Sequence, residues 1–161
     1  MPNNFVLPSN QSDINGFIHK INNIHVTCDA SGEETELYCC ENAIDTGVDN
    51  HFHSGIHENS WLQVSFPKNR IMISHYSIQS PKKDSNSFWT APISWYLSGR
   101  KDDNSEWEVI DHVTESKIDG NLIVLTRSVN NSGPYTSFRL NMIGKNYGDI
   151  TALRIYKLDF F

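Results

Sequence analysis

Apolar and polar residues alternate with a period of two in short runs along most of the chain, and turn-forming residues separate the runs. The clearest runs span 61–66, 71–78 and 93–99, and they are bounded by Pro67, Pro81 and Gly99. Further runs follow at 24–28, 107–110, 122–125, 138–142 and 153–161. Alternation of this kind is typical of half-buried strands, and short strands at this spacing predict an antiparallel sandwich or barrel. We therefore predict an all-β domain of about eight strands.

One segment near the N-terminus has a different period. Its apolar residues recur at helical spacing after the N-cap candidates Ser12 and Asp13. These apolar residues are Ile14, Phe17, Ile18 and Ile21. We predict a short amphipathic helix within an N-terminal lead of residues 1–23, followed by a β-sandwich domain over residues 24–161.

The tryptophans divide into two groups by their position. Trp61, Trp95 and Trp107 lie inside predicted strands, and we expect them in the core because each ring can bury a large apolar area. Trp89 follows Phe88 in a polar loop, where an aromatic ring can stack on a sugar or anchor a protein partner.

Composition and charge narrow the possible partners. The chain has 161 residues, enough for one domain with its own core, and a formal net charge of −6 that argues against nucleic-acid binding. No apolar run is long enough to cross a bilayer, so we expect no membrane insertion. Residues 1–12 lack the basic start and apolar centre of a secretory signal, which favours an intracellular, cytoplasmic location.

The cysteine pattern agrees with an intracellular protein. The chain has three cysteines, of which Cys39 and Cys40 are adjacent, so a disulfide framework of the extracellular kind is not indicated. We expect Cys28, Cys39 and Cys40 to be reduced, partly buried thiols.

Several motifs occur in the order and spacing of a known family. They are 42–45 with 52–54, then 60–66, 73–78, 94–99 leading through 102–105 to 107–110, and 138–140 with 144–146 and 158–161. From about Ile24 to Phe161 the chain thereby resembles the discoidin domain, also called the coagulation factor 5/8 type C domain, of the galactose-binding-like superfamily. The segments 14–18 and 144–146 are most similar to the intracellular branch found with BTB modules. The resemblance implies a jelly-roll β-sandwich that binds ligands with the loops at one end.

Non-catalytic recognition is the function that this resemblance implies. We expect first a protein-interaction domain of a larger adaptor, and as an alternative a lectin-like module for galactose-type or related glycans. The candidate ligand-binding residues are His53, Phe88, Trp89 and Arg100. No nucleophile with a matched base, paired carboxylates or Gly-rich phosphate loop occurs at a recognisable spacing, so we do not expect an enzyme.

Two metal sites are conceivable. Many discoidin domains hold calcium beside the opening loop, and the resemblance implies Asp45, Asn50 and Asp159 as its oxygen ligands here, with structural calcium as the cofactor. The alternative is an Asx-turn loop whose carboxylates accept backbone N–H groups. His51, His53 and His57 have the spacing of a zinc site, which would accompany a metal-dependent enzyme.

Overall fold

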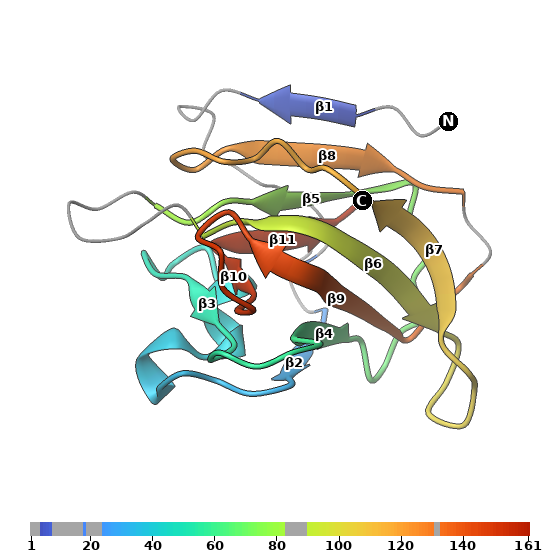
Figure 1. Cartoon of the computed structure of the whole chain (residues 1–161). Coiled ribbons are helices and arrows are strands. Elements are labelled where there is room, and N and C mark those ends of the chain that lie inside the picture. Colours follow the sequence, from blue (N-terminus) through green and yellow to red (C-terminus); the bar gives the residue numbers. More distant parts are fainter. Residues whose placement is uncertain (1–3, 8–17, 19–23, 83–89, 131–132) are drawn as a thin grey trace.

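The strands form two larger sheets and one small ribbon. The computed structural model describes residues 4–7, 18, 24–82, 90–130 and 133–161. One sheet has the strand order β1-β8-β5-β11, the other has the order β2-β4-β9-β6-β7, and β10 pairs with β3 in a separate ribbon. Figure 1 shows the two larger sheets as the layers of a sandwich, with the ribbon at one end of it.

Every strand pairing is antiparallel. The four-stranded sheet contains β1 (Asn4–Leu7), β5 (His75–Gln79), β8 (Val124–Ser128) and β11 (Lys157–Phe160). The five-stranded sheet contains β2 (Thr27–Ala30), β4 (Trp61–Ser65), β6 (Pro92–Arg100), β7 (Glu108–Val113) and β9 (Ser137–Asn146). The ribbon contains β3 (Phe52–His53) and β10 (Arg154–Ile155), and two 3-10 turns, η1 (Glu36–Tyr38) and η2 (Cys40–Ala43), precede it.

The predicted all-β antiparallel sandwich is confirmed, and most predicted runs contain an observed strand. The helix expected between residues 13 and 22 falls outside the described residues apart from Ile18, and the described helices are the two 3-10 turns. β1 lies within the predicted lead and pairs with β8. None of the helices in the described ranges has the length and apolar character needed to cross a membrane.

Large aromatic side chains fill the space between the sheets. Phe138 stacks on Phe160 with ring centroids 4.6 Å apart, and Phe66 meets both rings edge-on. Trp95 is fully buried, as expected. The largest buried side chains come from both sheets and from the connections between them, so the core is shared by both layers.

Trp61 and Trp107 do not join this core. Both are half-buried, and the Arg139 guanidinium lies 3.9 Å from the Trp61 ring centre and 4.5 Å from that of Trp107. The alternation in β4 explains the position of Trp61, because Leu62 and Val64 face inward and their neighbours therefore face outward. The expectation that these two rings are core was wrong: Trp61 lies on the outward face of β4, and Trp107 lies in the turn just before β7.

A buried polar network joins the two sheets. Tyr76 of β5 donates to Asp111 Oδ2 at 2.8 Å and accepts the Trp95 Nε1–H at 2.8 Å. Arg127 of β8 binds the same carboxylate through two nitrogens, at 2.8 and 2.6 Å. Asp111 and Trp95 belong to the five-stranded sheet, whereas Tyr76 and Arg127 belong to the four-stranded sheet. The side chains of Arg127 and Asp111 are only 8% and 4% exposed, so each charge depends on the other.

Replacing Asp111 with alanine is expected to lower the free energy of unfolding by about 3–5 kcal/mol, because the buried Arg127 would lose its counter-charge. Urea unfolding followed by tryptophan fluorescence measures the change. The matched control is Asp103→Ala, which removes an exposed ion pair with Arg100 and should cost about 1 kcal/mol or less. Equal losses in the two variants would contradict a network that joins the sheets.

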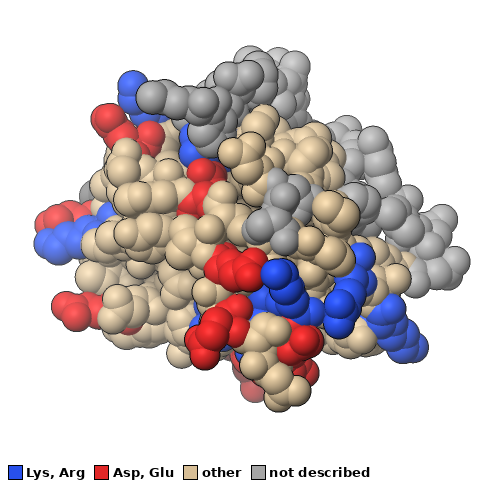
Figure 2. Space-filling model, turned by 90° about the vertical axis from the view of Figure 1, so that its right-hand side faces the viewer, with Lys and Arg blue, Asp and Glu red and all other residues tan. Residues whose placement is uncertain are grey.

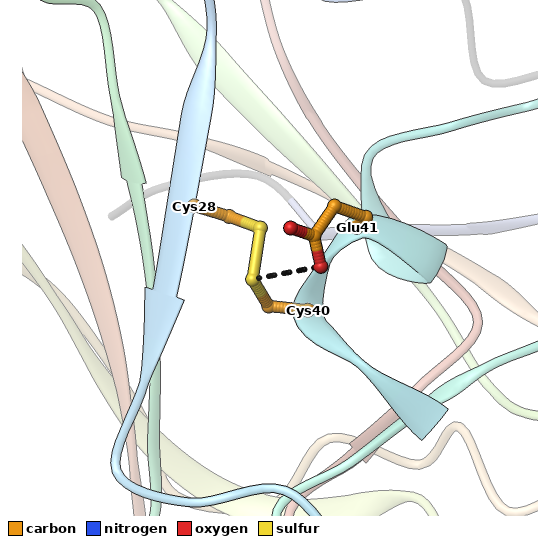
Figure 3. A group of neighbouring side chains, drawn as sticks. All are labelled: Cys28, Cys40 and Glu41. Atoms are coloured by element: carbon orange, nitrogen blue, oxygen red, sulfur yellow. Dashed lines mark hydrogen bonds between the residues drawn. A yellow bond between two sulfur atoms is a disulfide. The ribbon is translucent and has the colours of Figure 1, made fainter. Parts of the chain in front are cut away.

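A disulfide links β2 to η2. Cys28 and Cys40 are bonded, and Cys39 is the free cysteine (Figure 3). The expectation of three reduced thiols was therefore wrong. The polar loop after β2 returns the chain to the side of that strand, which brings two cysteines separated by 12 residues together. Burial, followed by the neighbouring Glu41, raises the pKa of the Cys39 thiol.

Reduction of this bond is expected to lower the free energy of unfolding by about 2–3 kcal/mol, because it releases a short loop in the unfolded chain. Thermal melts with and without a reductant measure the loss. A thiol assay on the unfolded, unreduced chain should detect Cys39 alone. Reaction of all three cysteines before reduction would show that the disulfide is absent.

Candidate ligand-binding site

One end of the sandwich brings together residues from four separate parts of the sequence. The β3–β10 ribbon, the two 3-10 turns and the start of β6 all lie at this end, away from the 101–107 turn (Figure 1). Glu34 is held against the ribbon because its N–H donates to the carbonyl of His53 at 2.9 Å. The ribbon thus places side chains from the loop after β2 next to side chains from β3 and β10.

His53 is a buried, neutral imidazole at this end. Its exposed fraction is 1%, and burial, followed by the positive charge of Arg154, lowers its pKa to about 4. The Gly55 N–H donates to Nδ1 at 3.0 Å, so the proton of the neutral ring is on Nε2. Nε2 lies 3.4 Å from the Glu34 carboxylate, so the carboxylate lies next to a neutral imidazole.

The surroundings of this pair combine polar and apolar groups. The Glu34 side chain is 42% exposed and can accept further hydrogen bonds. Leu37, three residues after Glu34, and Ile56, three residues after His53, are 64% and 69% exposed. The Tyr38 ring lies 4.8 Å from the His51 ring and 6.2 Å from the His53 ring, measured between centroids. An exposed carboxylate beside rings and aliphatic groups is suited to a ligand with both hydroxyl and C–H surfaces.

Arg154 connects this pair to the start of β6. It is the register partner of His53 in the ribbon, and its Nη1 donates to the Thr90 hydroxyl at 3.2 Å. Thr90 directly follows Phe88 and Trp89 in the sequence, and these two candidate ligand residues lie outside the described residues. Arg154 thus links the β3–β10 ribbon to Thr90, two residues before β6 begins.

Arg100 lies at the other end of the same strand. β6 runs from Pro92 to Arg100, a rise of about 26 Å at the usual spacing along a strand. The Arg100 guanidinium lies over the Trp107 ring at 4.7 Å and pairs with Asp103 at 3.2 Å. Figure 2 looks onto this end and shows acidic and basic side chains intermingled. The structure therefore does not bring Arg100 and His53 into one site.

Each of the three residues predicted to hold calcium makes hydrogen bonds with main-chain groups. The Asp45 side chain accepts the Gly47 N–H at 2.8 Å, as in the Asx-turn alternative. The Asn50 side chain accepts the N–H of the next residue and donates to the Leu37 carbonyl. Asp159 is fully buried and accepts N–H groups from Ile18 and Phe160. These side chains are used for backbone hydrogen bonds, and they do not fit a calcium ion.

The three histidines predicted as a zinc site do not gather either. His57 Nε2 lies 3.0 Å from the Ser54 carbonyl oxygen, whereas His53 is engaged by Gly55 and Glu34. Within the described ranges, the one close group of potential metal ligands is Cys28, Cys40 and Glu41. Its two sulfurs form the disulfide of Figure 3, and a disulfide offers no thiolate to a metal.

Comparison with solved structures identifies the fold. A CBM32 module of Clostridium perfringens, in complex with GalNAc-β-1,3-galactose, has a TM-score of 0.68 at 17% identity and covers 84% of this chain and 94% of its own. An F5/8 type C domain of Bacteroides fragilis has a TM-score of 0.65 at 12% identity, with 87% and 93% covered. This chain has the discoidin fold.

A third match widens the range of ligands seen with the discoidin fold. The chitosan-binding module 2 of a Paenibacillus chitosanase/glucanase, in complex with chitotriose, has a TM-score of 0.65 at 11% identity and covers 84% of this chain and 95% of its own. No protein-family model matches the sequence, and a search of curated proteins found no match.

Sequence reasoning missed two residues of this end of the discoidin fold. Glu34 lies in an acidic loop without periodicity, and no spacing signal pairs it with a residue far along the chain. Arg154 was placed in one continuous strand over 153–161, but the strand breaks at Tyr156, and β10 leaves β11 to pair with β3. His53 was predicted as a ligand-binding residue; it is buried, and its neighbour Glu34 is the more exposed of the two.

The free energy of unfolding is expected to fall as the pH drops from about 6.5 toward about 4. The folded-state pKa of His53 lies below the ordinary value, so the unfolded chain binds the proton first and the folded state loses on the order of 2–3 kcal/mol. Urea unfolding at successive pH values measures this loss. A His53→Gln variant removes this contribution, and parallel pH curves for the two proteins would contradict a buried neutral imidazole.

Proposed function

We propose that this chain is a non-catalytic carbohydrate-binding module whose ligand docks at the end that carries Glu34, His53 and Arg154. The observation that carries the proposal is the exposed Glu34 carboxylate, 3.4 Å from the buried neutral imidazole of His53, at the end of a discoidin fold. A carbohydrate presents many hydroxyl donors, and a fixed carboxylate is a strong acceptor for them.

The other groups at this end match the remaining parts of a sugar. Arg154 is a donor beside the pair, and it supplies positive charge close to His53. Leu37 and Ile56 provide exposed aliphatic surface, and the Tyr38 ring of η1 lies near the His51 and His53 rings. Sugar rings have apolar C–H faces, which such side chains can cover while the polar groups fix the orientation.

The comparisons favour this function over the protein-interaction role that we expected first. Two of the solved structures described above are complexes with carbohydrates, one with a galactose-containing disaccharide and one with chitotriose. They support the class of ligand, and the galactose-type preference is our proposal from the sequence resemblance.

The disulfide indicates the kind of compartment in which we expect the module to act. Cytosolic thiols are kept reduced, and disulfides persist in oxidising compartments. The Cys28–Cys40 bond therefore supports a secreted or otherwise oxidising location over the cytoplasmic one that we expected. An extracellular location also agrees with glycan binding.

A Glu34→Gln variant is expected to bind its glycan about tenfold more weakly or worse, because a charged acceptor is replaced by a neutral one. The probe is an array of galactose-terminated, N-acetylgalactosamine-terminated and chitooligosaccharide glycans, followed by calorimetry with the best binder. Trp89→Ala tests the predicted stacking ring in the same assay.

Arg100→Ala is the control, because Arg100 lies at the opposite end and should leave the affinity unchanged. Thermal melts verify that each variant is folded. If the folded wild-type protein bound no glycan on the array, the proposal would be rejected. If Arg100→Ala lost binding while Glu34→Gln bound as the wild-type protein does, the binding site would lie at the Arg100 end.

A further inference from the structure

Lys157 is a buried lysine whose ammonium group lies inside the loop that leads to the candidate site. The residue is 3% exposed and begins β11. Its Nζ donates to the carbonyls of Asn42, Val48 and Asn50 at 2.5, 2.9 and 3.2 Å. An ammonium group has three N–H donors, and here each of them meets one main-chain oxygen.

The loop gives this ammonium group the surroundings of a bound cation. Three main-chain carbonyls converge on one point, which is how proteins commonly supply part of the oxygen shell of a hard cation. Burial lowers the pKa of Lys157 to about 8, whereas the negative charges of Asp45 and Asp49 favour its charged form. The Tyr156 ring lies 4.3 Å from Nζ, and its hydroxyl donates to Asp49 at 2.7 Å. Positive charge at this point is therefore compensated on several sides.

The same loop positions the candidate ligand site. The Asn42 side-chain amide donates to the His51 carbonyl at 3.0 Å and to the Leu37 carbonyl at 2.8 Å. The Asn50 amide also donates to Leu37. Since β3 follows directly, the shape of the 42–50 loop determines where β3 starts and where the η1 rim lies.

We infer that the Lys157 ammonium group occupies the place of a calcium ion in the 42–50 loop, so that this chain keeps the loop closed without a metal. A tethered cation needs no supply of free calcium and cannot be removed by a chelator. The 42–50 loop is thus fixed by a residue near the C-terminus, over more than a hundred residues of sequence. The link to ligand binding rests on the proposed function, whereas the cation replacement itself does not.

The first test uses the wild-type chain in its folded form. Its melting temperature is expected to be the same in excess calcium and in excess EDTA, and calorimetry should detect no calcium binding. A rise in melting temperature with calcium, or a fall with EDTA, would overturn the inference, because either result requires a bound metal. This measurement involves no glycan, so its failure is separate from that of the proposed function.

Two substitutions test the role of the ammonium group directly. Lys157→Met keeps the length of the side chain but leaves three buried carbonyls without a donor, so the melting temperature should fall by about 5 °C or more, with or without calcium. Lys157→Glu replaces the cation by a carboxylate, and calcium should raise its melting temperature by several degrees. The inference would be overturned if calcium did not raise the melting temperature of Lys157→Glu. It would also be overturned if Lys157→Met melted at the same temperature as the wild-type chain.

Lys145→Met is the matched control, because Lys145 is an exposed lysine that pairs with Asp149. It should melt as the wild-type chain does, with and without calcium. Hydrogen exchange of the 42–50 backbone amides locates the effect, and exchange should quicken there in Lys157→Met and not in Lys145→Met. Uniform exchange across this loop in all three proteins would show that the ammonium group does not hold it.

Discussion

The ion pair between Asp111 and Arg127 is the interaction on which the sandwich depends. Two facing sheets can slide over an apolar core, since dispersion contacts have little direction. A carboxylate that accepts two hydrogen bonds from one guanidinium group has a defined geometry, and here it also accepts the Tyr76 hydroxyl. The pair is therefore suited to fixing how the sheets sit on each other, at the cost of removing two charges from water.

At the end of the sandwich, Lys157 likewise provides hydrogen bonds to polar groups that lie away from water. The 42–50 loop turns three carbonyls toward one buried or part-buried point, where unpaired backbone groups are costly. At the Asp111–Arg127 pair and at Lys157, a charged side chain makes hydrogen bonds of defined geometry, which apolar packing does not provide. Beside the core and these two polar centres lies the ribbon end, where we propose the ligand docks.

The candidate site shows why function was harder to predict than fold. His53 was recognised because it occurs in a motif together with Phe52 and Ser54. Glu34 and Arg154 were not recognised, because their proximity arises from a two-residue ribbon that closes over long stretches of chain. Arg100 was assigned to the same site as His53 on sequence alone, but Arg100 lies at the far end of β6 from Thr90, which contacts the ribbon through Arg154. The disulfide was missed for a similar reason, since an adjacent pair of cysteines gives no indication of which one faces β2.

The sequence by itself determined the all-β class and the positions of most strands, because alternation with a period of two is a local property of the backbone. It also indicated a discoidin-type sandwich through the order of its motifs. Only the tertiary structure decided that Lys157 lies among loop carbonyls, that Asp111 meets Arg127, and that Glu34 lies beside His53. Each of these contacts joins residues far apart in sequence, and their pairing depends on sheet register and loop closure, which no local pattern encodes.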